Sequence, residues 1–176
     1  MERWLWGGPV VGGRRPRWAL ALLLPGLLLA CSGGERVPSD MAAHPLIGRW
    51  TTDDVIVFYD ATGRSLEART FRIRAEDWAD VLGLEPREVS FAADGTYWSE
   101  QRGVAGNLVE RTSGRWATSE SRLTLIQIAP NNAELNYHYE VEGARLTFES
   151  QVDWDSDGAE DDFYVSRGRR ANTEQD

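Results

Sequence analysis

From Leu46 onward the chain is a succession of short apolar runs separated by turn residues. Residues 55–59 (VIVFY) precede Asp-Ala-Thr-Gly, and residues 122–128 (RLTLIQI) stop at Pro-Asn-Asn. In residues 135–141 apolar and polar side chains alternate, so that Leu135, Tyr137, Tyr139 and Val141 share one face of a strand. About eight to ten such segments, at spacings of about 8–12 residues, are typical of an antiparallel sandwich or barrel. The sequence therefore predicts an all-β domain.

Two glycine-containing pairs are expected to mark turns between these strands. Asp94-Gly95 lies between the runs 88–91 and 96–99. It predicts a two-residue hairpin loop, since both central positions of the favoured turn need positive φ. Ser113-Gly114 separates the runs 108–111 and 115–118 in the same way. The last strand is expected over about residues 162–167.

Residues 74–84 (RAEDWADVLGL) interrupt the strand pattern. Ala75, Trp78, Val81 and Leu82 recur at helical spacing, and Gly83 follows them as a typical C-terminal residue. We expect a short amphipathic helix here. It either caps an open end of the sheet or forms a mobile lid over a pocket.

The first 30 residues have the pattern of an export signal. Arg14, Arg15 and Arg17 precede residues 18–30 (WALALLLPGLLLA), an apolar stretch too short to span a bilayer comfortably. It ends in Leu-Leu-Ala before Cys31, the single cysteine of the chain. This junction resembles a bacterial lipobox. The resemblance implies cleavage before Cys31, a diacylglycerol on its sulfur and usually a third acyl chain on the new amine. An ordinary signal peptide or a signal anchor is the alternative.

The resulting organisation is a signal peptide (1–30), a lipidated Cys31 with a flexible tether (31–45), a β-barrel domain (46–170) and a tail (171–176). The tether is rich in Gly, Ser and Pro. Two or three acyl chains anchor a protein stably, so we expect an exported protein attached to a membrane through Cys31. The outer membrane is expected if the cell has one, because Ser32 is not the Asp that retains many enteric lipoproteins at the inner membrane. Otherwise the outer face of the cytoplasmic membrane is expected.

The charge and the residue types exclude several function classes. All nineteen basic residues are Arg, which excludes every lysine-dependent chemistry. The leader has four Arg and one Glu, so the remaining 146 residues have a net charge of −12, which disfavours nucleic acid as a partner. His44 and His138 lie too far apart in the sequence for a zinc signature, and no nucleophile motif occurs. We therefore expect no enzymatic activity.

Several short motifs follow one another in a family-like order. Residues 46–50 (LIGRW) resemble the L-x-G-x-W opening of lipocalins and of bacterial lipocalin-like lipoproteins. Residues 91–97 (FAADGTY), 113–116 (SGRW), 123–125 (LTL) and 139–148 (YEVEGARLTF) resemble the later hairpin and strands of those bacterial domains. The resemblance implies an up-and-down antiparallel β-barrel with a cup. It also implies that Trp50 closes the base of the barrel under an Arg from near the last strand, for which Arg167 is the match. Gly48 would let the chain bend close to this floor.

Six aromatic residues are candidates to line the cup: Phe58, Tyr97, Trp116, Tyr137, Tyr139 and Phe148. A solid core is the alternative for each of them. The sequence therefore supports a module that binds a small apolar or amphipathic ligand. The alternative is a structural or interaction protein of the cell envelope, with a filled barrel that binds a protein or polysaccharide. A cavity of several hundred Å³ would favour the first hypothesis.

Residues 153–162 (DWDSDGAEDD) are the densest chemical feature of the chain. Asp153, Asp155 and Asp157 at positions 1, 3 and 5, followed by Gly158, match the first half of a calcium loop. Position 12 is Tyr164 instead of the bidentate Glu of an EF-hand, so Asp161 or Asp162 would have to complete the ligand set. The sequence predicts at most a weak Ca²⁺ site, and a solvated acidic hairpin is the alternative. We expect no other cofactor.

Overall fold

The computed structural model describes residues 44–59 and 69–171, so the predicted signal peptide, Cys31 and most of the tether lie outside the described residues. Within the described part of the chain, nine strands and one α-helix follow one another. They are β1 (Gly48–Tyr59), β2 (Arg69–Arg74), α1 (Trp78–Leu82), β3 (Glu88–Phe91), β4 (Thr96–Arg102), β5 (Leu108–Ser119), β6 (Arg122–Ala129), β7 (Ala133–Glu142), β8 (Arg145–Val152) and β9 (Asp162–Arg170). No helix among these residues is long and apolar enough to cross a bilayer.

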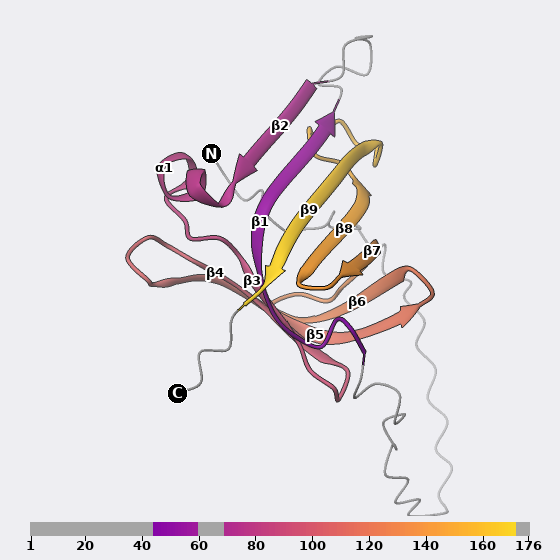
Figure 1. The fold of residues 1–176 in the computed structure, drawn as a ribbon. Helices are drawn as coiled ribbons and strands as arrows, with labels where there is room; N and C mark the ends of the chain where they lie inside the picture. The colour runs from indigo at the N-terminus through magenta and orange to yellow at the C-terminus, as the bar shows by residue number, and fades with distance from the viewer. Residues whose placement is uncertain (1–43, 60–68, 172–176) are drawn as a thin grey trace, which may run out of the picture.

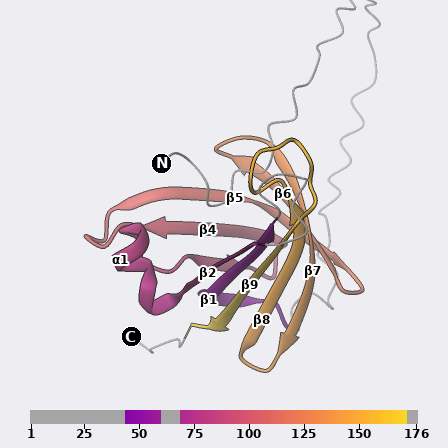
Figure 2. The same cartoon turned by 90° about the horizontal axis from the view of Figure 1, so that it is seen from above.

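Eight of the strands form a closed antiparallel barrel, as the sequence predicts. Neighbours in sequence pair from β3 through β9, and β9 pairs with β1 to close the ring (Figure 1). In the perpendicular view, β4 and β5 lie on one side of the barrel and β8 and β9 on the opposite side (Figure 2). Closure leaves few unpaired strand edges, which removes a site at which other chains would add.

One edge of strand β1 pairs with β9, and its other edge pairs with two different strands. Residues 48–51 pair with β3, whereas residues 54–59 pair with β2, which lies outside the ring. The register with β9 shifts between Thr52 and Asp54, which is a β-bulge. An extra residue at a bulge reverses the alternation of side chains between the two faces of a strand. Trp50 therefore points into the barrel, and so do Val55 and Val57 beyond the bulge.

The floor of the barrel is built on Trp50. The Trp50 indole donates to the Leu46 carbonyl (2.8 Å), and the Arg170 guanidinium lies 4.3 Å from the centre of the Trp50 ring. Arg170 also donates to the carbonyls of Ile47 (2.6 Å) and Pro45 (2.8 Å). Gly48 has a φ of +125°, and a Cβ there would lie 2.6 Å from the Arg170 guanidinium.

The expectation that Arg167 covers Trp50 is therefore wrong, and Arg170 occupies that position. Ser166, Gly168 and Arg170 alternate with Arg167 along β9. The two arginines are three positions apart in the sequence, which places them on opposite faces of the strand. Arg167 consequently lies on the outer surface, where it pairs with Asp54.

The two predicted turns have different outcomes. A hairpin does join β3 to β4, but its loop is longer than two residues, since the Gly95 N–H bonds to the Ala92 carbonyl (3.1 Å). Gly95 has a positive φ and Asp94 does not. Ser113-Gly114 is not a turn, because β5 continues through both residues with a bulge between them. A Cβ on Gly114 would lie 2.0 Å from the Ile126 carbonyl oxygen, so close strand approach explains this glycine.

The predicted helix is present as a 3₁₀ turn (Ala75–Asp77) followed by α1, and Gly83 ends it in the left-handed conformation. Trp78 is buried and packs with Val55, Val57, Ile73 and Tyr164 in a second apolar cluster, separate from the one around Trp50. The helix thus acts as a cap on the end of the barrel opposite the floor, beside β2 (Figure 1).

We predict that Arg170→Gln lowers the free energy of unfolding by about 2–4 kcal/mol, because two charge-assisted hydrogen bonds and a cation–π contact are lost. Arg167→Gln is the matched control and should cost less than about 1 kcal/mol, since its side chain is half exposed. Urea unfolding of the mature domain measures both values. Equal losses in the two variants would reject the floor described here.

Candidate functional site

The predicted cup residues do not line an open cup. Tyr97, Trp116, Tyr137 and Phe148 are buried together around Phe91, with ring centroids 5.6–6.4 Å apart for the contacting pairs. Tyr139 is only partly buried at the edge of this cluster, where its hydroxyl donates to the Glu120 carbonyl (3.3 Å). These rings fill the floor half of the barrel.

Phe58 is outside the barrel, which contradicts its assignment to the cup. It is 43% exposed and lies opposite Phe163 of β9, with their ring centroids 6.4 Å apart. The β1 bulge is the physical reason. It turns Asp54, Ile56 and Phe58 outward, although unbroken alternation from Trp50 would point them inward.

The two histidines have separate surroundings. The His44 ring lies 5.2 Å from the Trp116 ring, and its Nδ1 accepts a hydrogen bond from the Leu46 N–H (3.3 Å). Burial lowers the pKa of His44, so the neutral ring is favoured in the folded protein. His138 is exposed on the outer face, 3.9 Å from Glu149. The structure does not bring the two histidines together.

A polar layer, which the sequence analysis missed, separates the two apolar clusters. Arg87 is only 2% exposed and points inward from the segment before β3. It donates to Ser99 Oγ (3.2 Å) and to Glu110 Oε2 (2.7 Å). Nothing in the local sequence marks this Arg, because its burial depends on strands that are distant along the chain.

Phenol groups share this layer. Burial raises the pKa of Tyr97 and of Tyr164 to about 12. Burial also raises the pKa of Tyr137 well above its ordinary value, with added contributions from the other two phenols. The Tyr97 hydroxyl and the side-chain amide oxygen (Oε1) of Gln101 are buried without a hydrogen-bond partner. Such groups are costly to leave unsatisfied and are often bridged by a bound water or ligand.

The space inside the barrel is small. The interior cavity beside Arg87, Phe91, Tyr97 and Phe148 has a volume of about 20 Å³. That volume holds about one water molecule, whereas small-molecule sites usually measure about 300–1,000 Å³. In this structure the barrel is therefore filled.

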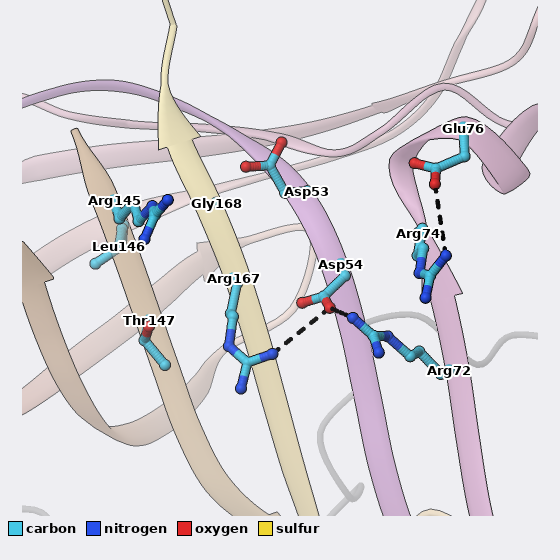
Figure 3. A pocket seen from close by; sticks show the side chains of 10 residues that line it. All are labelled: Asp53, Asp54, Arg72, Arg74, Glu76, Arg145, Leu146, Thr147, Arg167 and Gly168. Carbon is cyan, nitrogen blue, oxygen red and sulfur yellow. Dashed lines mark hydrogen bonds and ion pairs between the residues drawn. The ribbon is translucent and has the colours of Figure 1, made fainter.

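A larger concavity lies on the outer surface. A groove of about 300 Å³ crosses β2, β1, β9 and β8 (Figure 3). Its charged residues come from all four strands and the 3₁₀ turn: Asp53, Asp54, Arg72, Arg74, Glu76, Arg145 and Arg167. None of these positions is distinctive in the sequence, and only the barrel register brings them together.

Asp54 is the centre of the groove. Its Oδ2 lies 2.6 Å from the Arg72 guanidinium and 3.6 Å from that of Arg167, so it holds one arginine from each neighbouring strand (Figure 3). Asp54 is 7% exposed, and its Oδ1 accepts no hydrogen bond. The site therefore leaves a buried acceptor for a donor group.

The groove has more arginines than carboxylates, with four of the former and three of the latter. Arg169, just outside it, neutralises Asp53 at 3.0 Å, which leaves a further excess of positive charge. Arg145 makes no ion pair with a carboxylate in the described part of the chain, although Glu142 lies opposite it in the register of β7 and β8. A chain with a net charge of −9 thus has a locally cationic groove.

Similarity to known proteins is limited to solved structures. No protein-family model and no curated protein matches the chain. A lipocalin-like protein from Bacteroides uniformis ATCC 8492 is 11% identical, with a TM-score of 0.46 over 73% of this chain and 100% of that one. Rv2717c from M. tuberculosis is 16% identical, with a TM-score of 0.39 over 77% of this chain and 98% of that one.

The acidic loop between β8 and β9 brings some of the predicted calcium ligands together. Carboxylate oxygens of Asp153, Asp155 and Asp162 lie within 4.8 Å of one another. Asp162 thus takes the closing position for which Asp161 was the other candidate. Asp157 and Asp161 are exposed and lie outside this group, and Asp157 accepts a hydrogen bond from the Ala159 N–H (2.8 Å).

The electrostatics of this loop are suited to a hard cation. Oδ1 of Asp153 and Oδ2 of Asp155 are shielded from solvent and have no hydrogen-bond partner. Desolvation raises the pKa of Asp155, and the carboxylates of Asp157, Asp162 and Asp153 raise it further. The raised pKa means that the ionised form of Asp155 is less favourable in the folded protein than in the unfolded chain. At a pH above the ordinary pKa of an Asp, this lowers the free energy of unfolding unless a cation is bound.

We predict that Ca²⁺ at about ten times its dissociation constant stabilises the mature domain by about 1.4 kcal/mol, and that EGTA reverses this. Asp155→Asn should remove the response to calcium and raise the melting temperature in EGTA at neutral pH, because it removes an unfavourable charge. Calorimetry with and without calcium measures both effects.

Asp161→Asn is the matched control for this experiment and should keep the full calcium response. A response that survives Asp155→Asn, or no response in the unmodified domain, would contradict the calcium prediction.

Proposed function

We propose that this protein is an exported, lipid-anchored binding protein without enzymatic activity, and that it binds its ligand on the outer face of the barrel. The observation that supports this location is the contrast between two volumes. The interior cavity measures about 20 Å³, whereas the outer groove measures about 300 Å³. This replaces the expectation of an apolar ligand in the cup.

The chemistry of the groove favours an anionic group on the ligand. Guanidinium groups bind carboxylate and phosphate oxygens through paired, charge-assisted hydrogen bonds. Among residues 44–59 and 69–171, Arg145 has no competing carboxylate contact within 4.0 Å, and Arg167 holds Asp54 only at 3.6 Å. Both arginines are therefore the residues from which a bound anion would accept hydrogen bonds, while Asp54 keeps Arg72 and Arg167 in place.

The negative net charge of the chain as a whole adds selectivity. Long polyanions would be repelled by the net charge of the mature chain, whereas a small anion contacts only the groove. This argument favours a small ligand over a polysaccharide with many acidic groups.

We predict that inorganic phosphate and acetate bind to the groove at low ionic strength. Arg145→Gln should weaken the binding about three- to tenfold, the effect of losing one charge-assisted contact. Arg111→Gln is the control, because Arg111 is exposed on β5 and pairs with Glu100 away from the groove. Changes in the arginine side-chain NMR signals during titration measure both affinities. Equal weakening by the two substitutions would reject the groove.

A second candidate function is the binding of a small polar ligand inside the barrel, which would require the cavity of about 20 Å³ to widen. The unpartnered Tyr97 hydroxyl and the unpartnered side-chain amide oxygen of Gln101 favour it. Native mass spectrometry of the mature domain distinguishes the two sites. A co-purified molecule that is retained by Arg145→Gln and lost from Tyr97→Phe would assign the ligand to the interior. The opposite result supports the groove.

Anchoring rests on the lipobox-like junction alone, since Cys31 lies outside the described residues. We predict that Cys31→Ser abolishes labelling by a radioactive fatty acid and moves the protein out of the membrane fraction, because acyl chains supply the attachment. Ser32→Ala is the control and should remain in the membrane fraction. Unchanged fractionation of Cys31→Ser would favour the signal-anchor alternative.

A further inference from the structure

The outer face of β1 and β9 continues from the groove into an apolar surface. Beyond the bulge, Asp54, Ile56 and Phe58 face outward on β1. Directly opposite them on β9 are Arg167, Val165 and Phe163. The two strands thus present an ion pair, then an aliphatic pair, then an aromatic pair, in successive rows about 7 Å apart.

The exposure of these rows increases with distance from the groove. Ile56 and Val165 are 8% and 4% exposed, whereas Phe58 and Phe163 are 43% and 40% exposed. Exposed apolar side chains that lie next to one another, as these two phenylalanines do, are a feature of contact surfaces. We call these three rows on β1 and β9 the strip. Arg72, which pairs with Ile56 in the register of β1 and β2, borders the strip on the side away from β9.

The position of the strip on the barrel favours a small ligand, and not the membrane, as the partner that contacts it. The described chain enters at the floor through His44 and Pro45, which contact Trp116 and Arg170. Phe58 lies at the other end of β1, about 30 Å away along a strand of this length. The apolar end of the strip is therefore remote from the end at which the tether enters.

We infer that the ligand of the groove is an anion with an apolar chain, whose head group contacts Arg145 and Arg167 and whose chain reaches the exposed rings of Phe58 and Phe163 past the buried row of Ile56 and Val165. This inference rests on the proposed function, since the same groove binds the head group. The rows between Asp54 and Phe58 span about 13 Å, which suits an alkyl chain of moderate length. Charge complementarity fixes the orientation, because Arg145 and Arg167 lie at the groove end of the strip and the aromatic pair lies at the other end.

Octyl phosphate and inorganic phosphate are the matched probes for this inference, used with the mature domain in isothermal titration calorimetry. Octyl phosphate below its micelle concentration should bind at least about tenfold more tightly than inorganic phosphate, because burial of apolar surface adds to the ionic contact. Phe58→Ser and Phe163→Ser should each reduce octyl phosphate affinity about three- to tenfold and leave inorganic phosphate affinity unchanged. Ile128→Ser is the control, since Ile128 is exposed on β6, away from the strip.

The outcomes separate the inference from the proposed function. Loss of affinity for both probes in Arg145→Gln, with loss for octyl phosphate alone in Phe58→Ser, supports the two together. Equal affinity of the two probes would overturn the apolar chain and leave the anion groove intact. Inorganic phosphate binding that Arg145→Gln does not weaken would reject the groove itself.

Phe58→Leu, which keeps an apolar side chain, should restore most of the octyl phosphate affinity lost in Phe58→Ser. A strip that instead joins two copies of the chain would appear in sedimentation as a dimer abolished by Phe58→Ser, and would also overturn the inference.

Discussion

The antiparallel pairing of β1 with β9 is the interaction on which the rest of the structure depends. It joins segments from opposite ends of the described chain and closes the ring of eight strands. The loop-closure entropy that this contact costs is offset by a full ladder of backbone hydrogen bonds and by the apolar clusters that the closed ring encloses. The same pairing places Arg170 over Trp50, so that the floor of the barrel forms only when the ring is closed.

The bulge in β1 divides the molecule into a filled inside and a chemically active outside. Before the bulge, Trp50 joins the aromatic cluster at the floor, and after it Val55 and Val57 join the cluster beneath α1. The reversal of side-chain alternation turns Asp54 and Phe58 outward, where each meets a partner on β9. One extra residue thus supplies both the charged centre of the groove and the aromatic end of the strip. The expected cup is occupied by its own aromatic residues and by Arg87.

The charge distribution explains how an acidic protein has a cationic groove, at which we propose an anion binds. The chain has no lysine, and its arginines project from neighbouring strands, where planar guanidinium groups contact carboxylates at fixed positions. Acidic residues are concentrated elsewhere, in the loop between β8 and β9, where three carboxylates converge. The two regions attract ions of opposite sign and lie at different places on the barrel, so a cation and an anionic ligand would not compete.

The sequence by itself determined the all-β class, the approximate number of strands, the short helix with Gly83 at its end, the role of Trp50 at the floor and the acidic loop with Asp153 and Asp155. Apart from the role of Trp50, which the resemblance to lipocalins implied, these features follow from local patterns, such as periodicity and turn residues, that do not depend on distant parts of the chain. The tertiary structure decided that Arg170 instead of Arg167 covers Trp50, that Phe58 points outward, that Ser113-Gly114 lies within a strand, and that Arg87 is buried. It also assembled the groove from four strands. Each of these depends on strand register, and the outward positions of Phe58 and Asp54 depend also on the β1 bulge. Because the side-chain period of a strand is two residues, a single-residue shift set by distant pairing partners exchanges the inner and outer faces.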